Sequence, residues 1–238
     1  MIAFPNVSSV AFLIGDPARA VMLAALMDGR ALPAGELAYA AGITAQTASS
    51  HLSKLLAGGL LLCESEGRHR YYRLAGPNVA HALEHLAAIS RPVRHKPLSR
   101  QGRDLHMARC CYDHLAGQLG VAVTAALVER HFLEPVAQKR YGVTPAGVTW
   151  FGTIGVAVAG LAPTRRGIAR QCLDWTERTH HLAGPLGVGL MAALCESEWL
   201  RRSKTSRLVH VTPKGWAKLK EQLGLDEQSV SGDDAVRA

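Results

Sequence analysis

Cysteine and histidine side chains recur in the second half of the chain at spacings that could bind a metal ion. Cys111 is followed three residues later by His114, and Cys172 is followed nine residues later by His181. Thiolate and imidazole ligands together suit zinc or another thiophilic ion. Residues three apart share one face of a helix, so Cys111 and His114 would act together if their segment is helical. The adjacent Cys110 and Cys111 offer an alternative, because a vicinal pair of thiols can bind an arsenical or be oxidised. A further alternative is that the cysteines only pack in the core, as free cysteines often do.

These ligands belong to two copies of one sequence pattern. The matched blocks, in chain order, are CYD at 111–113 with CLD at 172–174, HLAGQLGV at 114–121 with HLAGPLGV at 181–188, and VTPAG at 143–147 with VTPKG at 211–215. Three matched blocks in the same order indicate an internal duplication. We place a first copy at about residues 106–165 and a second copy at about 166–225, within a C-terminal domain of residues 106–238.

Each copy is expected to form a helix, a β-hairpin and a second helix, which is a winged-helix-like order. In the second copy the first helix is expected to begin at His181. Packing of the copies about a pseudo-twofold axis would bring Cys111 and Cys172 together. Asp113 and Asp174 are expected to cap a helix or pair with arginine rather than to bind metal.

The N-terminal part carries the signals of a helix-turn-helix. Asp16 and Pro17 suit the start of a helix, Gly42 suits the end of a second helix, and Thr44 suits the N-cap of a third. Alternating residues around a turn then predict a β-hairpin wing. The expected elements are helices over about 17–27, 33–41 and 44–56, strands over 60–64 and 69–74, and a closing helix over 77–89. The fold class predicted is mainly α with small β-hairpin wings (α+β), with a winged helix-turn-helix in residues 1–90 and a basic linker at 91–105.

Four short motifs follow one another between Asp16 and Leu74: Glu-Leu-Ala before the turn, His-Leu-x-x-Leu, Gly-Leu, and Glu-Gly-Arg with a following Tyr. In this stretch the chain resembles the winged helix of the ArsR/SmtB family of bacterial transcriptional repressors. The CYDHLAG and CLDW…HLAG segments are similar to a subgroup of these regulators with an extended C-terminal region. The resemblance implies a homodimer that releases operator DNA when a metal or another signal arrives.

The resemblance also implies where metal ligands would lie in the N-terminal domain. Arsenic- and cadmium-type members carry Cys-x-Cys after a Glu-Leu, but here Glu36 and Leu37 precede Ala-Tyr-Ala, so that site is absent. Zinc-type members use acids and histidines on the last helix, where this chain has His81, Glu84 and His85. The order His-x-x-Glu-His differs from the order of ligands in zinc-type members. It matches an inverted zinc-protease motif, but so short a helix argues against a protease. A solvated helix face and a zinc site at a dimer interface remain the alternatives.

DNA would be contacted by the second helix of the helix-turn-helix and by the wing. The first turns of such a helix reach base edges, where a Gln can pair with adenine, while basic side chains contact phosphates. The residues expected to contact DNA are Thr44, Gln46, Thr47, Ser49, Ser50, His51, Lys54, Arg68 and Arg70.

Charge and composition agree with a regulator that binds double-stranded DNA at an inverted-repeat operator. The net charge is +8, and the stretch from Lys54 to Arg103 holds nine basic and three acidic residues. Five cysteines at no disulfide-framework spacing suit a reducing cytoplasm, and the apolar stretches are too short to predict a membrane span. The absence of a P-loop, GxGxxG, G-x-S-x-G or paired-acid motif argues against an enzyme. The signal that releases the regulator from DNA could be a metal, a thiol-reactive agent or a small molecule. The alternative function is that of a winged-helix ligand-binding or scaffold protein without specific DNA recognition.

Overall fold

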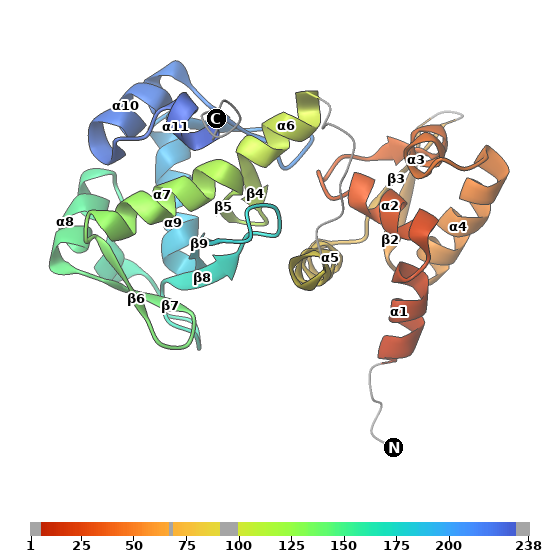
Figure 1. Cartoon of the computed structure of the whole chain (residues 1–238), viewed down its shortest axis with the longest axis horizontal. Helices are drawn as coiled ribbons and strands as arrows, with labels where there is room; N and C mark the ends of the chain where they lie inside the picture. Colours follow the sequence, from red (N-terminus) through yellow and green to blue (C-terminus); the bar gives the residue numbers. More distant parts are fainter. Residues whose placement is uncertain (1–5, 67–68, 91–99, 232–238) are drawn as a thin grey trace, which may run out of the picture. The chain divides into compact units, whose positions relative to one another are not determined.

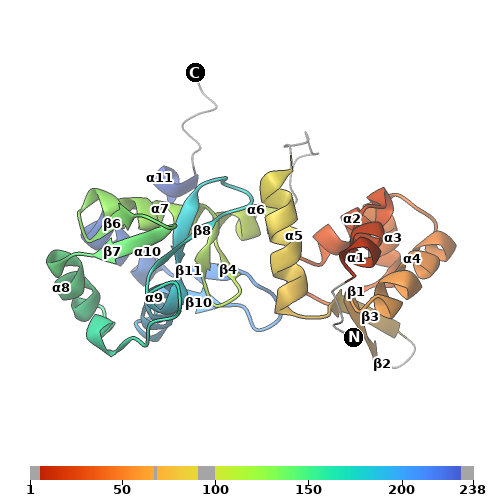
Figure 2. The ribbon, with the colours of Figure 1, turned by 90° about the horizontal axis from the view of Figure 1, so that it is seen from below.

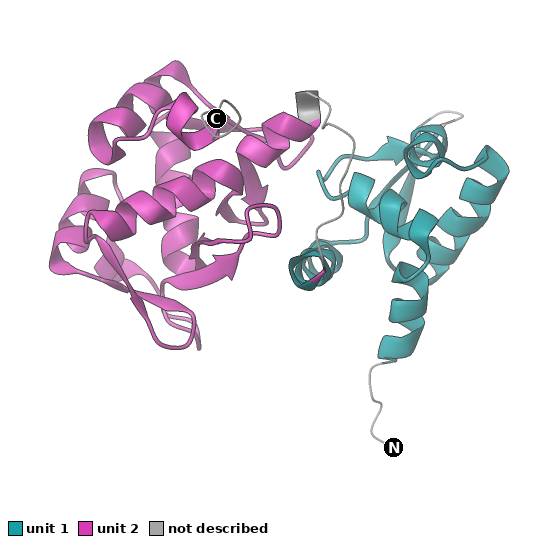
Figure 3. Cartoon of the chain, viewed as in Figure 1, with its two compact units in different colours: residues 1–89 teal, residues 90–238 magenta. Residues whose placement is uncertain are grey.

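The computed structural model describes residues 6–66, 69–90 and 100–231. The chain splits into two compact units, Met1–Ile89 and Ser90–Ala238 (Figure 3). Each unit has its own buried core.

The first unit contains a small antiparallel sheet of strand order β1-β3-β2 and helices that surround a leucine-rich core (Figure 1). Its elements are α1 Val7–Ile14, α2 Pro17–Ala25, β1 Leu32–Pro33, α3 Ala34–Ala41, α4 Ala45–Ala57, β2 Leu61–Glu66, β3 His69–Leu74 and α5 Pro77–Ile89. Helices α2, α3 and α4 contact one another, and α4 contacts β2. This arrangement is the predicted winged helix-turn-helix, which is therefore confirmed.

Local sequence signals explain why these helices begin and end where they do. The Asp16 carboxylate accepts a hydrogen bond from the Arg19 N–H at 3.0 Å, which caps α2. Gly42 ends α3 with a φ of 65°, a left-handed conformation that glycine adopts without strain. Thr44 then caps α4. Helix α1 and strand β1, which pairs with β3, were not predicted.

The second unit contains the same order of elements twice: a β-hairpin, a helix, a second β-hairpin and a second helix. Its elements are α6 Arg100–Met107, β4 Arg109–Cys111, β5 His114–Ala116, α7 Gly117–Glu129, β6 Leu133–Val136, β7 Arg140–Val143, α8 Pro145–Thr153, the 3₁₀ helix η1 Val158–Gly160, β8 Arg170–Leu173, β9 His180–Ala183, α9 Gly184–Glu196, β10 Leu200–Arg202, β11 Val209–Val211, α10 Pro213–Leu223 and α11 Glu227–Ser231. Helix α6 begins inside the predicted linker, whose residues 91–99 lie outside the described part of the chain.

The two copies exchange their first hairpins. Hairpin β8–β9 of the second copy joins β6–β7 of the first copy in one sheet of order β6-β7-β8-β9. Hairpin β4–β5 of the first copy lies beside β11 of the second, where the Val209 N–H donates to the Ala108 carbonyl at 3.1 Å. Helix α7 contacts β9 and helix α9 contacts β5, four elements that are labelled in Figure 1. Figure 2 shows the ribbon from a second side. Each copy therefore contributes its first hairpin to the fold of the other copy.

The prediction that HLAG begins a helix is wrong in both copies. His114 and His181 lie on strands β5 and β9, and the helices begin only at Gly117 and Gly184. The strands form because the preceding residues supply antiparallel partners, β4 and β8, that the apolar pattern of HLAG does not reveal.

Helices α7 and α9 occupy the place of a recognition helix but are buried along much of their length. Neither α7 nor α9 therefore offers a free polar face to a DNA groove. Among the described residues no single helix is long and apolar enough to cross a membrane. The two helices Val7–Ile14 and Pro17–Ala25, which meet at a bend of 86°, together match a broken membrane span by length and composition only.

Candidate DNA-binding surface and metal centre

Helix α4 presents the predicted DNA-contacting face to solvent. Ala48, Leu52 and Leu55 are buried and fix the helix on the core. The exposed side carries most of the residues expected at base edges or phosphates: Thr44, Gln46, Thr47, Ser49, Ser50 and Lys54. The polar face is therefore available to a major groove.

His51 and the two threonines also stabilise the domain. The His51 ring is half-buried, with Nδ1 3.3 Å from the Arg19 guanidinium and 3.9 Å from Asp16. Thr44 Oγ1 accepts the Thr47 N–H at 3.2 Å and contacts the Thr47 hydroxyl at 2.9 Å. These contacts tie the start of α4 to its own cap and to α2, so Gln46, Ser49 and Ser50 remain the freer candidates for reading bases.

The wing adds positive charge beside α4. Arg70 is exposed, and its guanidinium lies 5.8 Å from the Tyr72 ring centroid. Arg73 is engaged by Glu64 at 2.8 Å. The predicted contact Arg68 lies outside the described residues.

The four predicted metal ligands Cys111, His114, Cys172 and His181 come together in the second unit, and we call them the Cys/His cluster. One ligand atom from each lies within 4.8 Å of the others, and three of the four residues are buried. Cys111 pairs with His114 across hairpin β4–β5, and Cys172 pairs with His181 across β8–β9. Hairpin pairing, not a shared helix face, brings each Cys next to its His.

Carboxylates lie behind both histidines of the cluster. His114 Nδ1 is 2.7 Å from Asp113 Oδ1, and His181 Nδ1 is 3.4 Å from Asp174 Oδ2. The Nε2 atoms of the two histidines face one another at 3.1 Å. Burial disfavours the charged imidazoles, yet contacts with these carboxylates and with Cys111 raise the pKa of both histidines above its ordinary value.

Asp174 is the anchor of a buried polar network, as expected for a capping or arginine-paired residue. It accepts from the Arg109 guanidinium at 2.6 Å and from the Gly117 N–H at 2.8 Å, at the start of α7. Burial opposes its ionisation, but His181, Arg109 and the Gly117 N–H hold the pKa of this carboxyl well below its usual range. The ion pair links the first copy to the second.

Cys110 does not join Cys111 in the cluster. Neighbouring residues of a strand point to opposite faces, and Cys110 packs in the hydrophobic core while Cys111 lies in the cluster. Burial raises the pKa of the Cys110 thiol. The two adjacent thiols are therefore not presented as one chelating pair.

Within the described part of the first unit, the histidines of α5 do not form a four-ligand group of this kind. His85 is exposed, and its Nδ1 lies 2.6 Å from the His81 carbonyl oxygen of its own helix. Glu84, in contrast, is buried. Helix α5 therefore presents His85, but not Glu84, to solvent.

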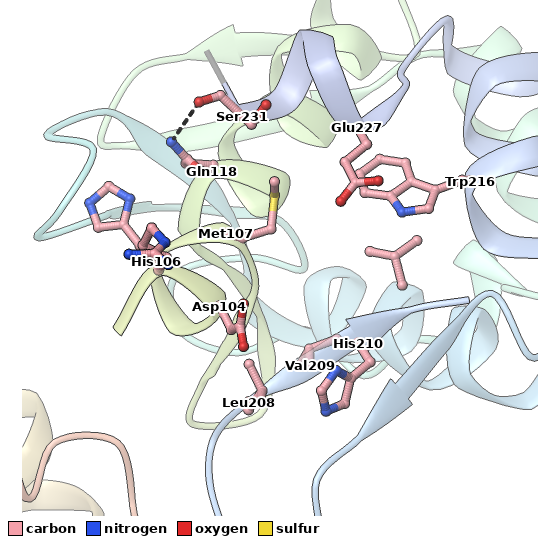
Figure 4. A pocket seen from close by; sticks show the side chains of 12 residues that line it. Asp104, His106, Met107, Gln118, Leu208, Val209, His210, Trp216, Glu227 and Ser231 are labelled. Carbon is pink, nitrogen blue, oxygen red and sulfur yellow. Dashed lines mark hydrogen bonds between the residues drawn. The ribbon is translucent and has the colours of Figure 1, made fainter. Parts of the chain in front are cut away.

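Sequence reasoning missed a pocket of about 370 Å³ in the second unit (Figure 4). Met107, Val209 and Trp216 form apolar parts of its wall, and His210 and Glu227 add polar groups. These residues come from α6 and from the consecutive elements β11, α10 and α11, which lie far from α6 in the sequence. No local motif marks such a site.

Comparison with known proteins bears on both units. Residues 14–64 match a family described as a helix-turn-helix domain. The Bacillus subtilis protein named uncharacterized HTH-type transcriptional regulator YdfF is 45% identical over 213 residues, which cover 89% of this chain and 94% of that protein. The HTH-type transcriptional regulator CmtR of Mycobacterium bovis is 41% identical over 76 residues, 32% of this chain and 64% of that protein.

A solution structure of a homodimeric winged helix-turn-helix domain from Mycobacterium bovis, a possible ArsR-family regulator, is 25% identical. It covers 40% of this chain and 100% of that one, with a TM-score of 0.33. The similarity to YdfF, in contrast, extends through nearly the whole of both proteins. Together with the winged helix-turn-helix of the first unit, it shows that the chain belongs to the family of HTH-type transcriptional regulators.

Proposed function

We propose that this transcriptional regulator is a homodimeric repressor that binds an inverted-repeat operator in double-stranded DNA and leaves it when a thiophilic metal ion binds the Cys/His cluster. The observation that carries the proposal is the convergence of Cys111, His114, Cys172 and His181 within 4.8 Å. Two thiols and two imidazoles held this closely form a metal-binding donor set. A duplicated C-terminal domain would thus act as the sensing part.

The first unit supports the DNA-binding half of the proposal. The exposed polar face of α4 suits base contacts, and Lys54 and Arg70 suit phosphates. The CmtR of Mycobacterium tuberculosis is described as a cadmium metal-sensor. For the present chain, the metal proposal rests on the ligands of its own second unit.

A homodimer is supported by apolar side chains that the first unit leaves in water. Val7 and Phe12 on α1 are 71% and 72% exposed, and Ile89 at the end of α5 is 82% exposed. Large apolar side chains on helices at the ends of a domain favour burial against another surface. A second copy of the same domain would provide one and would match a symmetric operator.

Two substitutions in α4 separate base reading from phosphate attraction. Gln46→Ala should cost about 1–3 kcal/mol on the preferred operator and less on random duplex, because only the amide can pair with adenine. Lys54→Ala should weaken all DNA alike and reduce the salt slope by about one. Fluorescence anisotropy with the chain's own promoter and with a shuffled duplex measures both.

The control is Gln228→Ala, which removes an exposed glutamine from α11 in the second unit. It should bind both duplexes as the wild type does. Equal affinity of the wild type for promoter and shuffled DNA would contradict the proposal and favour a scaffold that binds proteins.

Loss of one thiol from the cluster should remove the metal response. Protein purified under reducing conditions should carry about one metal ion per chain, and Cys111→Ser should carry none, because only three ligands remain. DNA release by added Zn²⁺ should disappear in the same variant. Elemental analysis and anisotropy measure the two effects.

Cys195→Ser is the matched control, since Cys195 is a half-buried thiol of the same unit that lies outside the cluster. It should retain both the metal and the release. A metal content that is the same in Cys111→Ser and in the wild type would refute the cluster as the site.

A small organic effector is the second candidate signal, and the pocket beside Trp216 favours it. Its size is within the usual range for small-molecule sites. A protein that binds its operator, ignores metal and responds to cell extract in a manner abolished by Trp216→Ala would support this candidate.

A further inference from the structure

We propose that the Cys/His cluster is a closed, four-ligand site for a divalent ion of the zinc type, in which Asp113 and Asp174 act as positioning residues that turn both Nε2 atoms toward the ion. The inference rests on the proposed metal site and specifies which ions it takes. It is carried by the geometry of the imidazoles and by the charges around them.

The orientation of the two imidazoles suits a cation between them. A carboxylate beside Nδ1 favours the tautomer with the proton on that atom, which leaves a lone pair on Nε2. Asp113 Oδ1 is within hydrogen-bond distance of His114 Nδ1 at 2.7 Å, whereas Asp174 Oδ2 lies 3.4 Å from His181 Nδ1 without a hydrogen bond of good geometry. The two Nε2 atoms face one another at 3.1 Å, and either a proton on one of them or a positive ion bound by both lone pairs relieves their repulsion. A metal ion can in addition be bound by the two thiols.

The spacing suits tetrahedral coordination. Zinc–nitrogen bonds of about 2.0–2.1 Å in a tetrahedron set the two nitrogens about 3.3 Å apart. The Nε2–Nε2 distance of 3.1 Å is close to this value. The thiols of Cys111 and Cys172 lie within 4.8 Å of one ring nitrogen of each histidine, so small side-chain shifts complete the tetrahedron.

Charge balance selects a dication. Bound as thiolates, Cys111 and Cys172 supply two negative charges, and the imidazoles are neutral. The Asp174 carboxylate is neutralised by Arg109 at 2.6 Å. Arg170, the matching residue of the second copy, exerts an attractive charge on Asp113. A divalent ion therefore leaves the buried cluster neutral, whereas a monovalent or trivalent ion leaves a net charge there.

The donor set points to the same ions. Two thiolates and two imidazoles in a tetrahedron are typical of zinc, and Co²⁺ can report on the same geometry. Ions that prefer thiolates alone find only two here, because Cys110 packs in the core away from the cluster.

The test measures metal binding to the full chain without DNA. Co²⁺ should give the spectrum of a tetrahedral thiolate site, Zn²⁺ should displace it at one ion per chain, and equimolar arsenite should not. Asp113→Ala should weaken Zn²⁺ binding about 10–100-fold in competition with a chromophoric chelator, while the Co²⁺–thiolate band keeps its position. Asp113→Asn, which keeps a hydrogen-bond acceptor, should lose less.

Asp113 is a suitable position because its side chain is 59% exposed, so the substitution leaves no cavity in the core; an unfolding curve checks that the variant is folded. Asp104→Asn, at an exposed aspartate of the same unit, is the control and should bind Zn²⁺ as the wild type does. Wild-type affinity in Asp113→Ala, or displacement of Co²⁺ by arsenite, would overturn the inference. Tight Zn²⁺ binding that leaves operator affinity unchanged would instead overturn the proposed sensing function and leave this inference standing.

Discussion

Replacement of Arg109 by methionine is expected to lower the free energy of unfolding of the second unit by about 3–5 kcal/mol. The Asp174 side chain is fully buried and the Arg109 side chain is 5% exposed, with 2.6 Å between them. Methionine fills similar space but leaves the carboxylate without its countercharge. Denaturant unfolding followed by tryptophan fluorescence measures the effect on the full chain, because Trp150, Trp175, Trp199 and Trp216 all lie in the second unit.

An exposed ion pair of the same unit gives the comparison. Lys214 and Glu198 lie 3.4 Å apart with side chains 55% and 71% exposed. Lys214→Met should change the free energy of unfolding by less than about 1 kcal/mol, since water screens this pair. A cost below about 1 kcal/mol for Arg109→Met as well would show that the buried network tolerates an unpaired carboxylate.

Gly147→Ala should destabilise the second unit by about 1–3 kcal/mol or more. A Cβ atom at Gly147 would overlap the backbone carbonyl of Phe132, which cannot move as a flexible side chain could. Gly215 stands in the same relation to Trp199 in the second copy, so Gly215→Ala should behave alike. The same tryptophan fluorescence curves measure both.

Gly152→Ala is the matched control because Gly152 lies on the same helix as Gly147, and a Cβ atom added there would meet nothing within 4 Å. Here alanine should stabilise by up to about 0.5–1 kcal/mol through its higher helix propensity. Equal effects of the two substitutions would mean that helix propensity, not close backbone approach, decides the outcome at Gly147.

The fold of the first unit could be predicted because its signals are local. Asp16, Gly42 and Thr44 mark helix ends within a few residues, and the alternation of the wing is visible in one short segment. Strand β1 was missed because two residues carry no periodicity of their own; their partner is β3, far along the sequence.

The candidate metal ligands were found for a different reason. The repeated blocks marked Cys111, His114, Cys172 and His181 without any knowledge of their conformation, and the structure gathers them through hairpins rather than through a helix. The pairing of Arg109 with Asp174 spans 65 residues. No local pattern can predict which arginine meets which aspartate over that distance, although an ionic partner for Asp174 was expected.

The exchanged hairpins have a consequence for how such a unit can be made. A chain with only one copy would lack the strand neighbours that the other copy supplies and would hold two of the four cluster ligands. Such a chain would need a second molecule to supply the missing strands and the missing ligands. The rate and the extent of this dimerisation would depend on the concentration of the chain. Joining the copies in one polypeptide replaces that encounter by an intramolecular one, with an effective concentration of order millimolar. Assembly of the cluster is thereby made independent of how many molecules the cell contains.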